Sequence, residues 1–154
     1  MRRLLYFVGL LCASVSTFAQ TTQEGIKFME TDRFIKAKKV FTSNYSQAPN
    51  AENAYYLGNY YFTTGKADSA KLYFNEGISK DANNPWNYIG SGKVNYSANP
   101  SQSKKDFDKA LQLTKNKNAQ VLLSIAQFYV ATDKLEVPAA FSLLDEAAKI
   151  TPKD

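Results

Sequence analysis

The residues that could perform chemistry are few, and none stands in a catalytic spacing. The chain has no histidine and a single cysteine, Cys12, so neither a Ser-His nor a Cys-His nucleophile can form. The segment 90–93 (Gly-Ser-Gly-Lys) lacks the spacing of a phosphate-binding loop and follows no predicted strand. The loop that begins at Asp81 lacks the central glycine and the terminal glutamate of a calcium loop.

Two carboxylate pairs remain as candidates for acid-base chemistry, Asp106 with Asp108 and Asp145 with Glu146. Both pairs fall on predicted amphipathic helices, on faces that we assign to solvent, where charged side chains ordinarily lie. We therefore expect no catalytic residue, no metal site and no cofactor. The sequence predicts a protein that is not an enzyme.

The basic residues do not form a nucleic-acid-binding stripe. The formal net charge is +5, and the cationic residues are spread along the chain. The one dense cluster, Lys36, Lys38 and Lys39, is interpreted as the solvated face of a helix. Nucleic acid is therefore not an expected partner.

The first 19 residues have the three parts of a secretory signal peptide. Arg2 and Arg3 precede an apolar run over 4–13, and small residues at Thr17 and Ala19 predict cleavage after Ala19. The run is shorter than the roughly 20 residues that cross a bilayer, so we expect no membrane span after the signal is removed. The predicted mature chain, 20–154, is mildly basic, and without Cys12 it can form no disulfide. Its length fits one domain.

A helical pattern recurs four times along the mature chain. Each copy has a small residue, a large apolar residue four places later and a third position three beyond that. The members are Ala37, Phe41 and Asn44; Ala70, Phe74 and Gly77; Ser103, Phe107 and Ala110; and Ala140, Leu144 and Ala147. Successive copies lie 33, 33 and 37 residues apart. The pattern predicts an internal repeat.

A partner helix precedes each of these helices. It is marked by a glycine or alanine, which permits close packing, and by an aromatic residue three places later. The markers are Gly25 and Phe28; Leu57, Gly58 and Tyr61; and Ile125, Ala126 and Tyr129. In the third copy either Ser91 with Val94 or Gly92 with Asn95 fills these positions, and the sequence leaves that register open.

The pattern resembles the tetratricopeptide repeat over residues 21–152, with a closing proline at Pro49 and Pro152. Departures are Asn44 in place of a small residue, Ala82 and Lys115 in place of the proline, and a longer turn in the fourth copy. The resemblance implies an all-α fold, a right-handed superhelix or α-solenoid of about four helix-turn-helix repeats. Their approximate bounds are 20–50, 51–83, 84–117 and 118–154. An unrelated helical bundle is the rival interpretation.

The family's geometry implies a concave groove lined by the first helix of each repeat. Aromatic residues surround the predicted helix 53–63, and Tyr55, Asn59 and Phe62 share one of its faces. Carried over position by position, the groove is lined by Met29, Tyr55, Asn59, Phe62, Lys93, Tyr96 and Gln127, with Trp86 at its edge. Lys93 depends on the open register, whereas Tyr96 points into the groove in either register. The alternative is that individual rings pack in the core.

These observations predict a protein-protein interaction scaffold of the cell envelope, in the periplasm or on the outer surface of a Gram-negative bacterium. The partner is expected to be a peptide or a helix of another protein. A carbohydrate- or peptidoglycan-binding module of a cell-wall system is the alternative, because tyrosine and tryptophan also stack on sugars.

The last predicted helix has an unusually wide apolar face. Ser142, Asp145, Glu146 and Lys149 are its only polar strip. The sequence therefore predicts that this helix docks on further repeats, on a second copy or on a partner.

Overall fold

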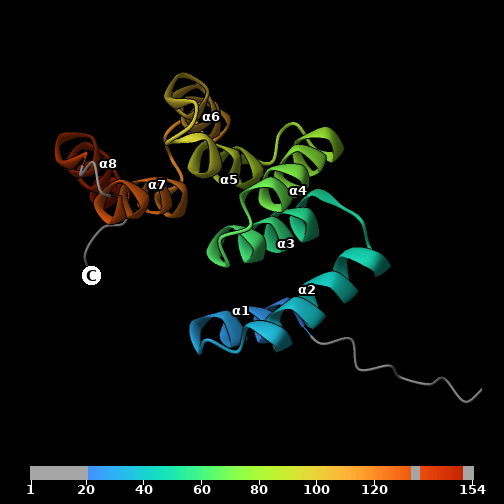
Figure 1. The fold of residues 1–154 in the computed structure, drawn as a ribbon. Helices are drawn as coiled ribbons and strands as arrows, with labels where there is room; N and C mark the ends of the chain where they lie inside the picture. Colours follow the sequence, from blue (N-terminus) through green and yellow to red (C-terminus); the bar gives the residue numbers. More distant parts are fainter. Residues whose placement is uncertain (1–20, 133–135, 151–154) are drawn as a thin grey trace, which may run out of the picture.

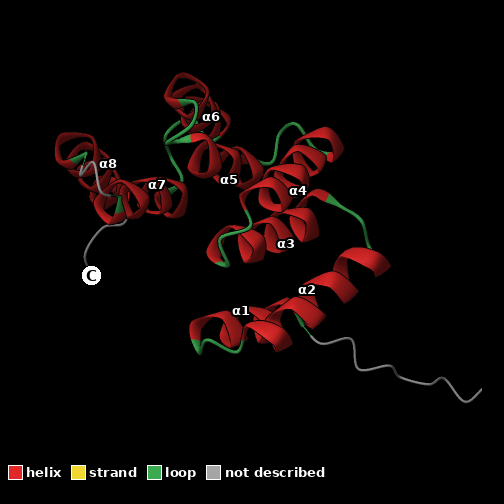
Figure 2. Ribbon diagram, in the orientation of Figure 1, coloured by secondary structure: helices red, strands yellow, loops and turns green. Residues whose placement is uncertain are grey.

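The computed structural model describes residues 21–132 and 136–150 as eight α-helices and no strand (Figure 2). The helices are α1 (Thr22–Glu30), α2 (Phe34–Gln47), α3 (Ala51–Thr63), α4 (Ala67–Lys80), α5 (Pro85–Asn95), α6 (Pro100–Leu113), α7 (Ala119–Ala131) and α8 (Val137–Ile150). The predicted all-helical class is confirmed. The signal sequence, the longer turn at 133–135 and Pro152 lie outside the described residues.

Most of the helices begin at a polar cap that the sequence places just before an apolar stretch. Asparagine side chains accept a backbone N–H at the start of α3, α5, α6 and α7, and Thr21 forms a capping box with Glu24 at α1. Pro85 and Pro100 occupy the first positions of α5 and α6, where no backbone donor is needed. These local signals fix where the helices start.

The helices form four antiparallel pairs that stack in sequence order (Figure 1). Each predicted repeat contains one pair. The second helix of one pair packs against the first helix of the next, as α2 does on α3, α4 on α5 and α6 on α7. The first helices α3, α5 and α7 also contact one another directly, which places them on the inner side of the stack. Such neighbour-to-neighbour packing is the architecture of a solenoid.

A phenylalanine ring packed on a glycine holds each of the first three pairs together. A Cβ atom added at Gly25 would lie 2.5 Å from the Phe41 ring, and one at Gly92 would lie 2.6 Å from the Phe107 ring. Real Cβ atoms do not approach so closely, so only glycine permits these helices to meet. The contact also fixes the register of the first helix in the third copy, because Gly92 rather than Ser91 meets Phe107.

The ring of Phe74 is held between two glycines of different helices. Gly58 of α3 and Gly90 of α5 both lie against the Cδ1, Cε1 and Cζ atoms of the ring, and Phe74 is 1% exposed. Phe74 therefore closes its own pair and also joins the second pair to the third. Beside it, the buried Asn87 donates a hydrogen bond of 2.9 Å to the backbone carbonyl of Ala51.

The prediction that both carboxylate pairs face solvent is wrong for Asp106. It is 5% exposed at the contact between α5 and α6, where its carboxylate accepts hydrogen bonds of 2.8 Å from Ser91 and from Gln102. A buried carboxylate is tolerated only when it is hydrogen-bonded in this way. Asp108 is exposed as predicted and pairs with Lys104 at 2.8 Å.

The glycine and phenylalanine packing predicts the effect of Gly90→Ala. Inside an exposed helix, replacing glycine with alanine stabilises the helix by about 1 kcal/mol. Here, however, the alanine methyl group would collide with the Phe74 ring. We expect a net loss of about 1–3 kcal/mol in the free energy of unfolding, the usual range for overpacking. Urea unfolding followed by circular dichroism measures it.

The control is the same substitution in a Phe74→Leu background. Leucine makes room beside Gly90, so the penalty of Gly90→Ala should shrink there, as a double-mutant cycle would show. An equal penalty in both backgrounds would contradict the proposed contact.

Candidate partner-binding face

The predicted groove residues fall on the first helix of each pair, α1, α3, α5 and α7, or, for Tyr96, at the residue that caps α5, in rows that repeat from pair to pair. One row lies near the carboxyl ends of these helices and consists of Met29, Phe62, Tyr96 and Val130. Val130 was not predicted, although it occupies the fourth copy's equivalent of Phe62 and Tyr96. It is 54% exposed, so the row ends in an apolar side chain that faces solvent.

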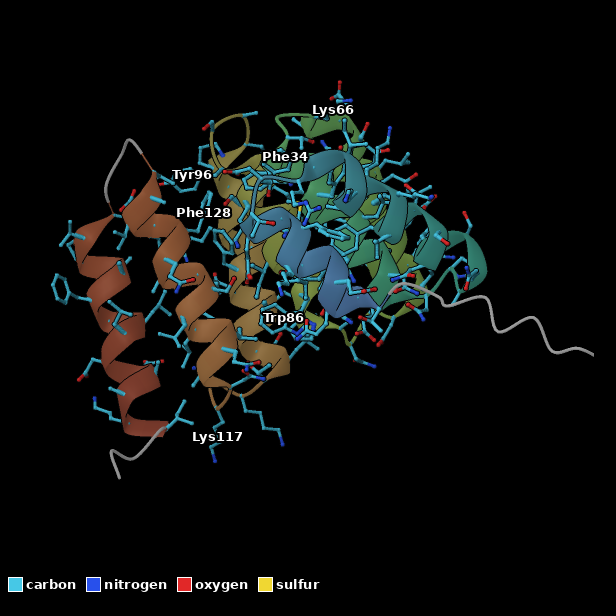
Figure 3. All side chains as sticks on the ribbon, turned by 90° about the horizontal axis from the view of Figure 1, so that it is seen from below. Phe34, Lys66, Trp86, Tyr96, Lys117 and Phe128 are labelled. Atoms are coloured by element: carbon cyan, nitrogen blue, oxygen red, sulfur yellow. The ribbon has the colours of Figure 1, made fainter. Side chains whose placement is uncertain are left out.

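Three rings from three inner helices meet at this end. The ring centroid of Phe128 on α7 lies 5.1 Å from that of Tyr96 on α5 and 6.4 Å from that of Phe62 on α3. Figure 3 shows Tyr96 and Phe128 close together. We call Phe62, Tyr96 and Phe128 the aromatic cluster. Phe128 could not be predicted, because its equivalents in the other copies are Lys27, Tyr60 and Val94.

Trp86 lies at the other end of the inner helices (Figure 3). It lines a hollow of about 480 Å³ that spans the amino ends of α3, α5 and α7. We call this the Trp86 hollow, and its lining residues are Glu52, Tyr55, Tyr56, Asn84, Trp86 and Gln120. Only Tyr55 and Trp86 of this set were predicted. The other four residues lie at or beside the amino ends of α3, α5 and α7. They could not be predicted together, because only the curvature of the stack brings these helix ends close to one another.

Tyr55 connects the hollow to the core. Its ring centroid lies 5.7 Å from that of Trp86 and 6.2 Å from that of the buried Phe74. Burial raises the pKa of Tyr55 to about 12, with a smaller contribution from the neighbouring Tyr56. The Tyr55 hydroxyl is therefore neutral at physiological pH.

Lys93 lies between the two ends of this face. Its side chain is half-buried, and its Nζ donates a hydrogen bond of 3.2 Å to the Ser124 hydroxyl. Burial lowers the pKa of Lys93 because the charged form loses hydration. Of the other predicted residues, Asn59 is half-buried, Gln127 is exposed and Met29 packs against the core of the first two pairs. The structure thus brings the predicted residues to two ends of one face.

This arrangement provides surfaces for binding. Aromatic rings give apolar contact, and amides, hydroxyls and single charges give directional hydrogen bonds. In residues 21–132 and 136–150 no group of histidine, cysteine or acidic side chains could hold a metal ion. None of the helices described there is long and apolar enough to span a membrane.

Solved structures with a similar fold include two with 83–84% of this chain aligned. MamA matches at a TM-score of 0.54 and 18% identity over 83% of this chain and 74% of its own. YrrB, described as a TPR protein with an unusual peptide-binding site, matches at 0.53 and 16% identity over 84% of this chain and 66% of its own. No protein-family model matches the sequence, and no curated protein matches it significantly. These similarities show a tetratricopeptide-like fold.

The lowered pKa of Lys93 predicts that Lys93→Met stabilises the fold at pH 7. The folded state binds the Lys93 proton less tightly than the unfolded state, whose pKa is about 10.5. The contribution of Lys93 to stability therefore rises with pH between the lowered pKa and 10.5 in the parent and is missing in the variant, whereas the tyrosines with raised pKa values affect both proteins alike. Urea unfolding at pH 7 and near pH 10 should show the advantage of Lys93→Met shrinking as the pH rises.

Lys71→Met is the matched control, since Lys71 is exposed on α4. It should change stability little at either pH. A Lys93→Met variant that is less stable than the parent at pH 7 would show that the Ser124 hydrogen bond outweighs the cost of burying the charge.

Proposed function

Because the chain has the tetratricopeptide-repeat fold, we propose that it is a non-enzymatic scaffold that binds a segment of another protein. The segment, an extended peptide or a helix, lies along the inner face formed by α3, α5 and α7. YrrB, which shares the fold, has a peptide-binding site. In this mode apolar anchors supply affinity and a few hydrogen bonds supply register.

The observation that carries this proposal is the apolar surface left on α7. Leu123 and Val130 are 37% and 54% exposed, and Val130 continues the row of Phe62 and Tyr96. Apolar side chains that gather on a concave face next to a cluster of rings are typical of a binding surface. Two amides, Asn59 and Gln127, flank them and can hydrogen-bond to a partner's backbone.

The proposed location is the cell envelope of a Gram-negative bacterium, in the periplasm or on the outer surface. The basic, apolar and small-residue segments over 1–19 are what supports export. A mature chain without cysteine or histidine is suited to an oxidising compartment, because it has no thiol to protect.

Binding of a cell-wall glycan is the alternative function. Tyr55 and Trp86 in the Trp86 hollow are the observation that favours it, since tilted rings beside amides also suit sugars. Sedimentation of the mature chain with purified peptidoglycan tests this alternative separately from protein capture.

The first prediction for this function concerns Phe62→Ala combined with Val130→Ser. We expect the double variant to lose at least tenfold in partner affinity, because two apolar anchors in the same row contribute about 1 kcal/mol or more each. The measurement is capture of an envelope partner on immobilised mature chain, followed by titration with the purified partner.

Leu72→Ser is the control, because Leu72 is 55% exposed on the outer helix α4. It removes a comparable apolar side chain and should leave partner binding unchanged. The groove proposal fails if the double variant remains folded by circular dichroism and binds as well as Leu72→Ser. Tyr55 is unsuitable for this test because its ring also contacts Phe74.

We also propose that α8 pairs with α8 of a second copy. Val137, Phe141, Leu144 and Ala148 form one stripe on α8, and Phe141 is 67% exposed. The equivalents of Phe141 in the other three copies are Lys38, Lys71 and Lys104, which are all exposed. A further stacked repeat would leave that position in water, so it would not cover Phe141.

An antiparallel pair of α8 helices would cover this stripe. If the two-fold axis of the pair passes between Phe141 and Leu144, Phe141 of one copy faces Leu144 of the other. Glu136 of one copy then faces Lys149 of the other. Both charged residues are exposed, so the ends of the pair are complementary in charge.

The expected result is a concentration-dependent dimer of the mature chain, measured by light scattering after gel filtration. Phe141→Lys should restore the monomer, because it places a charge where the other three copies have lysine. Ile35→Lys is the control, since Ile35 is 89% exposed on α2 and lies outside the stripe. A parent chain that stays monomeric at high concentration would refute the pairing.

A further inference from the structure

We propose that the Trp86 hollow binds an arginine side chain of the partner segment. The proposal rests on the proposed function, because it names which residue of the partner enters the inner face at the amino ends of α3, α5 and α7. It is carried by three features of the hollow: a carboxylate with no ion-pair partner among the described residues, two half-buried rings that line it, and helix ends at which one donor each is already capped.

The carboxylate is that of Glu52. Within the described part of the chain, Glu52 forms no ion pair and no side-chain hydrogen bond. It is exposed in the first turn of α3 and lines the Trp86 hollow. Its negative charge contributes to raising the pKa of the adjacent Tyr56, after the larger effect of burial. The carboxylate of Glu52 is therefore available to a ligand that enters the hollow.

Lys80 on the neighbouring surface forms no ion pair with Glu52. A second hollow adjoins the first, shares Glu52 and Asn84 with it, and is also lined by Lys80 and Asp81. The Nζ of Lys80 lies over the ring of Tyr45, 5.9 Å from its centroid. Asp81 adds a second carboxylate. The charge beside the hollow is thus complementary to a cation.

The amino ends of three helices meet here, and helix dipoles alone would favour an anion. One backbone donor at each of these ends is capped by a side-chain oxygen of the chain itself. Asn50 accepts from Asn53, Asn84 from Trp86, and Asn118 from Val121, at 2.9–3.2 Å. Pro85 at the start of α5 has no N–H to offer. We take the carboxylate of Glu52, which lines the hollow itself, to decide the sign of the ligand.

The rings add a planar stacking surface. Trp86 packs against the core of the third and fourth pairs and also lines the hollow. The Tyr55 ring is inclined to it at 45°. A cation over the face of tryptophan is attracted by the ring quadrupole. A guanidinium also stacks as a plane and forms two parallel hydrogen bonds to a carboxylate, which an ammonium cannot do. Arginine is therefore preferred to lysine.

The experiment uses the indole of Trp86, the only tryptophan in the chain, as a reporter of the site. The mature chain is titrated with acetyl-Gly-Arg-Gly-amide, and the indole N–H resonance is followed by NMR. The isosteric citrulline peptide, which has no charge, and the lysine peptide are titrated in parallel. We expect a saturable shift with arginine, a weaker one with lysine and none with citrulline at the same concentrations.

Glu52→Gln should weaken binding of the arginine peptide at least fivefold, and added salt should weaken binding to the parent. Asp68→Asn is the matched control, because Asp68 occupies the same second position of α4 as Glu52 does of α3. It removes the same charge away from the hollow and should leave binding unchanged. Glu52 is exposed, so its variant should fold.

Equal shifts with arginine and citrulline, or an unchanged affinity in Glu52→Gln, would overturn the proposal. A shift of the indole by a peptidoglycan fragment and not by arginine would overturn it in favour of a sugar site. Partner binding that depends on Phe62 and Val130 is measured at the opposite end of the face. If the chain still binds its partner but does not bind the arginine peptide, the arginine site is refuted and the proposed function is not.

Discussion

The packing of a phenylalanine ring on a glycine is the contact on which the rest of this structure depends. It sets how closely the two helices of a pair approach, and in Phe74 it also sets how closely the next pair stacks. The inner helices can touch one another only because this approach is short. The aromatic cluster and the Trp86 hollow are both made by side chains of successive inner helices, so both inherit their geometry from these glycines.

The third pair shows how the same architecture tolerates polar groups in its core. Ser91, Asn95 and Gln102 surround the carboxylate of Asp106, and Asn87 reaches back to the second pair. These hydrogen bonds have defined directions, whereas apolar contacts do not. The third pair, whose sequence matches the repeat least well, is thus held together by hydrogen bonds between α5 and α6 and is joined to the second pair by one more, in addition to ring packing.

The sequence was sufficient for those features that depend on local spacing. The repeat of Phe41, Phe74 and Phe107 predicted the helix pairs and their order, because a small residue and a ring at fixed separation imply close packing. The burial of Asp106 was not predictable, since two of its partners, Ser91 and Asn95, come from a helix whose register was open. Glu52 and Gln120 were missed for another reason: only the curvature of the whole stack brings the ends of α3 and α7 to one hollow.

The double role of Phe74 also has a consequence for the order in which the molecule folds. Almost all contacts join neighbouring helices, so loop closure costs little entropy at each step and structure can propagate from one pair to the next. The second and third pairs share Phe74 and the bond from Asn87 to Ala51, so they form the natural nucleus. The end pairs, α1–α2 and α7–α8, each have a neighbouring pair on one side only among the described residues, and local opening should therefore begin at the two ends. Amide hydrogen exchange would be slowest around Phe74 and faster toward both end pairs.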